Sequence, residues 1–200
     1  MLPNRLCFEL FPTNTYHHNS GGDPEAIPDL SYDELMAFYK GHYHPSNAIL
    51  LTFGNLPVAQ HHDAFESRAL HRFEKSKEVI EVHPEQSFEA PKRATHRYAL
   101  DDSDAADKTH LIMGWKLGES SDLDAMLEAQ LLSSVLMENS ASPLMQWLET
   151  NDLGTAPSPL CGLEESMREM VLCCGIEGSE ANRANQFEAS VLDVIRKTAQ

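Results

Sequence analysis

The sequence has few of the features that identify a membrane protein, a secreted protein or a disulfide scaffold. No apolar run approaches the roughly 18 residues that a membrane-spanning helix needs. Glu9 and Pro12 interrupt the N-terminal stretch where a signal peptide would have its apolar segment. The 4 cysteines form no C-x-x-C pair, a pattern that predicts buried thiols in a reducing compartment. These absences predict a cytoplasmic chain with no membrane partner.

Positive charge is also scarce. The chain has 15 Lys and Arg against 31 Asp and Glu, which gives a formal net charge of -16. A surface this acidic repels phosphate groups, so neither nucleic acid nor an anionic lipid surface is an expected partner. Cationic peptides would be attracted to it, although solubility alone explains such a charge at least as well.

The motifs of the common catalytic and metal sites are missing. Neither H-E-x-x-H nor its inverted form H-x-x-E-H occurs, and there is no G-x-S-x-G nucleophile turn. The pair Gly21–Gly22 is followed by Asp23 rather than by the lysine of a phosphate-binding loop, so no nucleotide site is expected. His42 and His44 could converge on a metal ion if their loop were extended; packing at a helix end and a turn is the alternative. The residues alone predict no catalytic side chain and no metal ligand.

Local signals predict the helices and strands. Ser31 and Glu34 fit a capping box that begins a helix reaching about His42. The run 47–55, apolar on both faces and bounded by turn residues, predicts a buried strand. Elsewhere, strands are predicted at 95–101, 109–117, about 155–163 and 167–177, and helices are predicted to begin at Pro57, Asp122, Ser142 and near Ser179.

Two details of these elements are specific enough to check. In the helix after Asp122, Leu123, Leu127, Leu131 and Val135 recur every four positions and predict the face that packs on the core, and Met126 and Leu132 widen that face. Gly154 follows the helix that begins at Ser142, where a left-handed residue would end it.

The order of elements predicts the fold class. Sequential strands joined by short turns favour antiparallel pairing, so we expect an α+β fold with antiparallel sheets and helices packed on one face. Residues 75–94 mix charges with prolines and have the composition of a linker. We therefore expect one domain part over 1–74, a linker over 75–94 and a second domain part over 95–200.

Two short stretches carry a resemblance to a known family. One is Ser20-Gly21-Gly22-Asp23-Pro24, and the other is Tyr43-His44-Pro45-Ser46-Asn47-Ala48. With Tyr16, Ile27-Pro28 and the Ser142-Pro143 region, they resemble the pitrilysin/insulinase class of zinc metallopeptidases, and within it the presequence-protease branch. The resemblance implies that Ser20–Pro24 and His44–Asn47 are structural signature residues.

The resemblance also implies an architecture and a cofactor. Such enzymes are built from repeated α+β domains that enclose a peptide chamber, and this chain would span the end of the first domain and the start of the second. The family's zinc ligands, an inverted H-x-x-E-H and a further glutamate, would lie before Met1, and its substrate-gripping Tyr and Arg would lie after Gln200. Zinc is therefore implied for a longer parent enzyme, and no zinc-binding or substrate-binding role is transferred to a residue of this chain.

These observations give two functional hypotheses. The first is a non-catalytic scaffold segment of a zinc metallopeptidase that degrades peptides, with the remainder of the enzyme as its partner and an organellar matrix as the alternative location. The second is a natural noncatalytic subunit of the same fold that acts in peptide binding or assembly. Unpaired sheet edges and apolar helix faces also predict self-association of the isolated chain.

Overall fold

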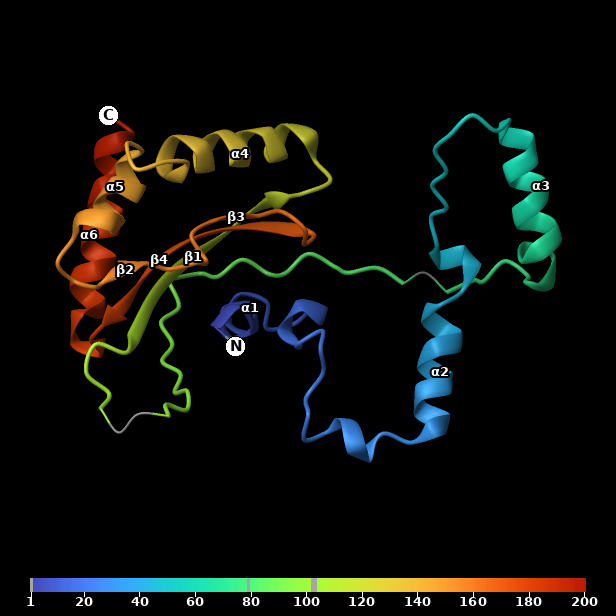
Figure 1. Ribbon diagram of the computed structural model, residues 1–200, viewed down its shortest axis with the longest axis horizontal. Coiled ribbons are helices and arrows are strands. Elements are labelled where there is room, and N and C mark those ends of the chain that lie inside the picture. Colours follow the sequence, from blue (N-terminus) through green and yellow to red (C-terminus); the bar gives the residue numbers. More distant parts are fainter. Residues whose placement is uncertain (1, 79, 102–103) are drawn as a thin grey trace. The chain divides into compact units, whose positions relative to one another are not determined.

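The computed structural model describes residues 2–78, 80–101 and 104–200, and its elements are shown in Figure 1. The chain divides into two compact units. One combines Met1–Asn19 with His83–Gln200, and the other is Ser20–Val82. The domain boundaries predicted at 74 and 95 stay a prediction, because the units report only which segments of this chain pack together.

A four-stranded antiparallel sheet organises the first unit. Its central strand is β4 (Glu169–Ser179), which pairs along most of its length with β1 (Thr109–Glu119). Two shorter strands, β2 (Ala156–Pro157) and β3 (Gly162–Glu164), pair with the other edge of β4. The strands predicted at 109–117 and 167–177 are confirmed, whereas the one predicted at 155–163 is split into β2 and β3.

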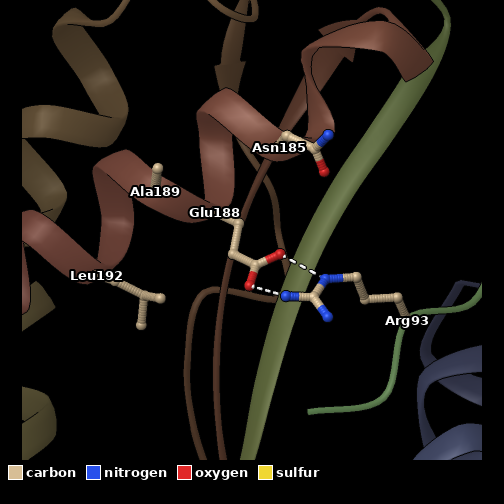
Figure 2. Close-up of a pocket in the computed structure, with 5 residues that line it drawn as sticks. All are labelled: Arg93, Asn185, Glu188, Ala189 and Leu192. Atoms are coloured by element: carbon tan, nitrogen blue, oxygen red, sulfur yellow. Dashed lines mark hydrogen bonds and ion pairs between the residues drawn. The ribbon is translucent and has the colours of Figure 1, made fainter.

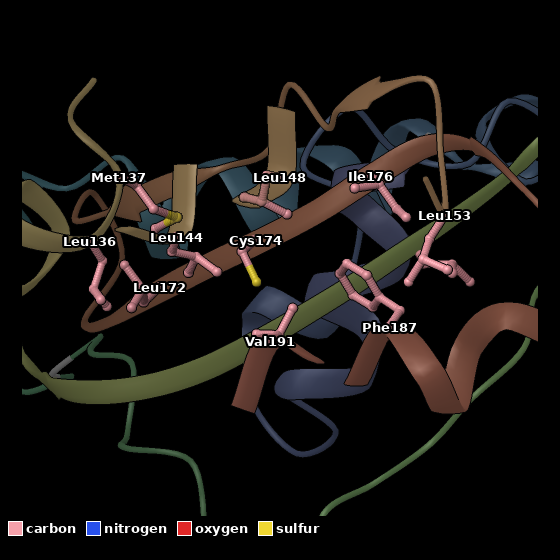
Figure 3. Packing of buried hydrophobic residues seen from close by; sticks show 11 residues of the cluster. Leu136, Met137, Leu144, Leu148, Leu153, Leu172, Cys174, Ile176, Phe187 and Val191 are labelled. Atoms are coloured by element: carbon pink, nitrogen blue, oxygen red, sulfur yellow. The ribbon is translucent and has the colours of Figure 1, made fainter. Parts of the chain in front are cut away.

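Helices cover one face of this sheet and create the main core. They are α4 (Leu123–Met137), α5 (Pro143–Thr150) and α6 (Ala184–Thr198), the last preceded by a 3₁₀ turn at Ala181–Arg183. Because successive strand residues point to opposite faces, Leu172, Cys174 and Ile176 of β4 all point toward these helices. Figure 3 shows the buried apolar side chains that fill this core: Leu111, Leu136, Met137, Leu144, Leu148, Leu153, Leu172, Cys174, Ile176, Phe187 and Val191.

A smaller cluster lies on the opposite face of β4. There α1 (Leu2–Leu10) and the next residue, Phe11, pack against Val171 and Cys173. Gly114 of β1 makes this close approach feasible, since a Cβ atom there would lie 3.2 Å from Leu6 Cδ1. The predicted α+β class is confirmed, and α1 adds a helix on the second face of the sheet.

The second unit contains α2 (Tyr32–His42) and α3 (Val58–Arg68), joined by irregular chain and 3₁₀ turns. The two helices begin where the capping box and Pro57 predict. The strand predicted at 47–55 is wrong: residues 48–53 are irregular, and Ile49 and Leu51 are 97% and 92% exposed. A strand needs a partner for its backbone groups, and in the described part of the chain no strand pairs with this segment.

Four further expectations need correction. Residues 95–101 do not form a strand; Tyr98 instead donates a hydrogen bond from its hydroxyl to the Lys108 carbonyl. The last helix begins at Ala184 rather than near Ser179, because β4 continues to Ser179.

The face predicted for α4 is also wrong. The helix packs on the sheet through its other side, where Ala129, Leu136 and Met137 are buried (Figure 1). The residues predicted to pack on the core are instead 56% to 79% exposed: Leu123, Leu127, Leu131 and Val135.

Gly154 is not the left-handed residue that ends α5. The side chain of Asn151 ends that helix instead, with its amide donating to the carbonyls of Trp147 and Leu148. Glycine is needed at 154 for space, because a Cβ atom there would lie 2.8 Å from the Glu177 carbonyl oxygen.

The 4 cysteines all lie in the described part of the chain and are free thiols. Cys173 and Cys174 are buried, and burial raises the pKa of the Cys173 thiol to about 12. Both thiols are therefore protonated at neutral pH and serve as apolar core residues. Among the described residues, no helix is both long and apolar enough to cross a membrane.

Candidate functional site

The first signature segment, Ser20–Pro24, forms a turn that leads into the second unit's first helix. The Asp23 carbonyl accepts hydrogen bonds from the backbone N–H groups of Ala26 and Ile27, and its carboxylate accepts one from Glu25 N–H at 3.0 Å. Gly22 has φ +80, and a Cβ atom on it would lie 3.0 Å from Ile27 Cδ1. The turn therefore needs glycine at position 22. It presents the negatively charged Asp23, whose Oδ1 already accepts a hydrogen bond within the turn, and such a group does not suit a phosphate ligand.

The helix that follows is capped as the sequence predicts. Ser31 Oγ accepts from Glu34 N–H, while the Glu34 carboxylate accepts from Ser31 N–H at 2.9 Å and from Ser31 Oγ at 2.6 Å. The hydrogen bond from the Ser31 hydroxyl, followed by the one from its backbone N–H, lowers the pKa of Glu34. The Ser31 hydroxyl and the Glu34 carboxylate therefore both serve to hydrogen-bond backbone N–H groups at the start of this helix.

The second signature segment, His44–Asn47, ends α2 and forms a 3₁₀ turn at Pro45–Asn47. His44 caps that turn, with Nδ1 accepting from Ser46 N–H at 3.1 Å. Asn47 reaches back through its side-chain amide to the His42 carbonyl at 3.1 Å, and Ser46 Oγ accepts from Ser76 N–H at 3.0 Å. The two signature segments thus precede and follow α2 in the chain, with the 3₁₀ turn Ile27–Asp29 between the first of them and the helix, and both shape the backbone. Their role as family signatures stays a prediction.

The described residues do not fit the zinc ion that the family resemblance implies. His42 Nδ1 interacts with the Phe38 carbonyl at 3.0 Å, and the His42 ring stacks on Phe38. His44 Nδ1 accepts the capping hydrogen bond from Ser46 N–H described above, so each of the two rings uses one nitrogen on a backbone group nearby in the chain. Across residues 2–78, 80–101 and 104–200, no group of three or more His, Cys, Asp or Glu side chains is placed to hold a metal ion.

A shallow pocket of about 310 Å³ lies beside α6 (Figure 2). Its polar part is an ion pair in which Arg93 donates two hydrogen bonds to the Glu188 carboxylate, at 2.8 and 2.6 Å. The hydrogen bond from Arg93 lowers the pKa of the Glu188 carboxyl group, and the same interaction raises the pKa of the Arg93 guanidinium group. The ion pair ties Arg93 to α6. Because its two charges neutralise each other, the pocket offers neither a nucleophile nor a free cation to a ligand.

The predicted linker contains a buried carboxylate that sequence reasoning missed. The Glu85 carboxylate accepts from Thr13 N–H at 2.8 Å, Thr13 Oγ1 at 2.7 Å and Gln86 N–H at 2.9 Å. Its own backbone N–H donates to Glu169 Oε2 at 2.6 Å. Thr13 and Glu169 lie 72 and 84 residues away in sequence, so no local pattern could have indicated these two partners. The cluster joins the start of the chain, the linker and β4.

Replacing Glu85 by Gln should reveal a pH-dependent contribution to stability. Burial raises the pKa of Glu85, but the hydrogen bonds from Thr13 and Gln86 outweigh it and leave the pKa below its ordinary value. The carboxylate therefore stabilises the fold above the unfolded-state pKa of about 4.3, and this contribution is lost as the pH falls through the lower folded-state value. We expect Glu85→Gln to lower the free energy of unfolding by about 1–3 kcal/mol at pH 7.

Urea denaturation at pH 7 and pH 3 would measure this difference. At pH 3 the wild type and the variant should differ by less than at pH 7, because protonation brings the wild-type group closer to the neutral amide. Glu89→Gln, at an exposed position four residues later, is the matched control. An equal loss at both pH values would contradict the assignment.

Comparisons with known proteins place the chain among peptidase sequences. The family described as "Peptidase M16 inactive domain" matches residues 29–200. The mitochondrial presequence protease of Xenopus tropicalis is 31% identical over 194 residues, which cover 96% of this chain and 19% of that protein. The mitochondrial presequence protease of Danio rerio is 35% identical over 173 residues, covering 85% of this chain and 17% of that protein.

A relative with a different name gives a similar match. Protein HypA of Clostridium perfringens is 27% identical over 197 residues, covering 98% of this chain and 20% of that protein. The chain therefore spans about a fifth of the length of the curated relatives it matches.

Proposed function

Because the chain belongs to the Peptidase M16 inactive-domain family, we propose that it is a non-catalytic scaffold segment of a peptide-degrading metallopeptidase. The observation that carries the proposal is the match of residues 29–200 to the inactive domain of that family. The resemblance to the presequence-protease branch is confirmed by relatives at 31% and 35% identity. That the segment helps to enclose a peptide chamber is part of the proposal.

The placement of the signature residues supports a structural role. Ser20–Pro24 and His44–Asn47 bracket α2 and use their polar atoms on the backbone. The zinc and the proteolytic chemistry would accordingly belong to other parts of a longer enzyme, which is the partner we propose. The mitochondrial relatives support an organellar matrix as one location; the cytoplasmic location stays a prediction.

The isolated chain should not cleave peptides. We expect no zinc-dependent turnover above background when the purified chain is incubated with saturating zinc and a fluorogenic peptide, because no described cluster could hold the metal. The variant His42→Ala/His44→Ala is the control for a histidine-based site. Turnover that depends on zinc would refute the proposed function, and its loss in this variant would locate the metal.

A second candidate function is a natural noncatalytic subunit that binds peptides or assembles with a catalytic partner. It is favoured by the apolar residues on the outer side of α4, of which Leu123 is 79% exposed. The reading frame upstream of Met1 distinguishes the two. An in-frame H-x-x-E-H there would favour the scaffold segment, and a genuine stop codon and promoter would favour the subunit.

A further inference from the structure

Strand β1 forms an open edge of the sheet. In the strand order β1-β4-β2 it comes first, and no strand among the described residues pairs with its outer side. β1 is 11 residues long and has no proline, and Lys116 and Glu119 are its only Lys, Arg, Asp or Glu residues. A long apolar edge offers unpaired N–H and C=O groups to another chain, so native proteins cover such an edge or place charges on it.

Residues 85–98, here called the strap, lie along this edge (green in Figure 1). Near the last residues of β1, Lys116 Nζ donates to the Gln86 carbonyl at 2.7 Å. Near its first residues, the ring centroids of Tyr98 and His110 are 5.8 Å apart. The strap therefore runs in the direction opposite to β1 and follows it over most of its length.

Two consecutive strap residues attach the strap to helices on both faces of the sheet. Lys92 Nζ lies 2.7 Å from a carboxylate oxygen of Glu9 on α1, the helix that covers the second face. Arg93 makes its two hydrogen bonds to Glu188 on α6, which covers the first face (Figure 2). Neighbouring side chains of an extended segment point to opposite sides, so these two ion pairs, here called the clasp, hold the strap across the β1 edge.

The strap covers the edge without adding a strand to it. No backbone hydrogen bond joins residues 85–98 to β1, and the structure describes both segments throughout. Pro91 has no N–H to donate and precedes two charged residues, and both features oppose strand pairing. The Lys92 and Arg93 side chains are 42% and 64% exposed. Exposed ion pairs are weak and are screened by salt, so the strap can be released.

We propose that the clasp protects the β1 edge, and that its release lets β1 pair with the β1 strand of a second copy of this chain. In an antiparallel pair centred on Gly114, Leu111 would lie opposite Leu117. Lys116 would lie opposite Ile112, so no like charges meet. The net charge of -16 opposes association at low salt. Salt screens both this repulsion and the clasp, so release and pairing both increase with ionic strength.

Limited proteolysis of the full 200-residue chain measures release of the strap. The clasp variant, Lys92→Glu/Arg93→Glu, places like charges opposite Glu9 and Glu188. Chymotrypsin should cut after Phe88, within the strap, about tenfold faster in this variant than in the wild type, and mass spectrometry identifies the cut. The wild-type rate should also rise in about 0.5 M NaCl, which screens the clasp.

Two further variants separate the clasp from net charge. Arg196→Glu/Lys197→Glu is the matched control, since it reverses two consecutive exposed cations that pair with Asp193 on α6. It changes the net charge equally and should leave cutting in the strap at the wild-type rate. Adding Glu9→Lys/Glu188→Arg to the clasp variant restores both ion pairs with reversed polarity, so it should return the cutting rate to that of the wild type.

Sedimentation equilibrium and hydrogen exchange measure the pairing of two copies. At about 0.15 M NaCl the clasp variant should dimerise at a concentration about tenfold lower than the control variant of equal charge. The outward N–H groups of β1 would become hydrogen-bonded in the dimer, so residues 109–119 should gain protection as the concentration rises. Far-UV circular dichroism should match the wild type in each variant, because all the substituted cations are exposed.

Three results would overturn the proposal. Equal cutting of the strap in the clasp variant and the control variant would show that the clasp does not hold it. Unchanged dimerisation after release would show that the strap protects no association surface. A dimer in which residues 109–119 gain no protection would assign self-association to another surface. None of these measurements uses the chain as a peptidase, so failure here is distinguishable from failure of the proposed function, which the zinc-dependent turnover tests.

Discussion

Gly175→Ala should lower the free energy of unfolding by about 3 kcal/mol, at the upper end of what overpacking of a core costs. Gly175 lies in β4 opposite Ile112 of β1. A Cβ atom on it would lie 2.3 Å from Ile112 Cδ1 and 2.7 Å from the Leu111 carbonyl oxygen. The isoleucine side chain can rotate away, but the carbonyl belongs to the backbone of β1, so the two strands would have to separate where their pairing is most extensive.

A double variant divides this cost into its two parts. Adding Ile112→Ala to Gly175→Ala removes the side-chain clash and leaves the backbone clash, so urea denaturation should show that the second change recovers only part of the loss, after correction for Ile112→Ala alone. Gly41→Ala is the matched control. A Cβ atom there meets nothing within 4 Å, and alanine in α2 should be neutral or stabilise by up to about 1 kcal/mol. Equal effects of the two glycine substitutions would contradict the packing described for β1 and β4.

Phe187→Ala should destabilise the first unit by about 3–5 kcal/mol. The Phe187 ring is buried between α6 and β4, and its centroid lies 5.9 Å from that of Trp147 on α5. Removing it leaves a cavity at the point where three elements meet, and the surrounding leucines cannot collapse into it without moving a helix. Urea denaturation with a two-state analysis would measure the effect, with near-UV circular dichroism, to which the core tryptophans Trp115 and Trp147 both contribute, as the probe of unfolding.

The same substitution at a fully exposed site isolates the contribution of burial. Phe53 is completely solvent-accessible, so Phe53→Ala should change the free energy of unfolding by less than about 0.5 kcal/mol. A loss at Phe53 comparable to that at Phe187 would show that residues 48–53 are packed in solution, against the exposure that the structure gives them.

What the sequence predicts well is set by local chemistry. The start of α2 follows from Ser31 and Glu34, and the start of α4 from Asp122, because a cap and its helix are neighbours in the chain. The strands β1 and β4 follow from short, nearly continuous apolar runs, the pattern expected of strands that are packed on both faces.

The errors arise where a distant or missing partner decides the outcome. The segment 48–53 has the composition of a buried strand, and the described chain supplies it with no neighbouring strand. In α4, leucines occupy both sides, so periodicity alone could not tell which side faces the sheet. The Glu85 cluster depends on Thr13 and Glu169, whose distance in sequence leaves no local signal.

The central position of β4 also has a consequence for how the chain is made. The pairs between β1 and β4 join residues 50 to 70 positions apart, from Glu119 with Glu169 to Thr109 with Ser179. At roughly 5–20 residues per second of synthesis, several seconds pass between the emergence of β1 and that of its partner. During that interval the apolar side chains of β1, and helix α1 with Cys7, have no sheet to pack on. Pairing of strands that lie 50 to 70 residues apart in sequence is also slow. The nascent chain is therefore most exposed to wrong association before residue 179 leaves the ribosome, and it is the arrival of β4 that ends this period.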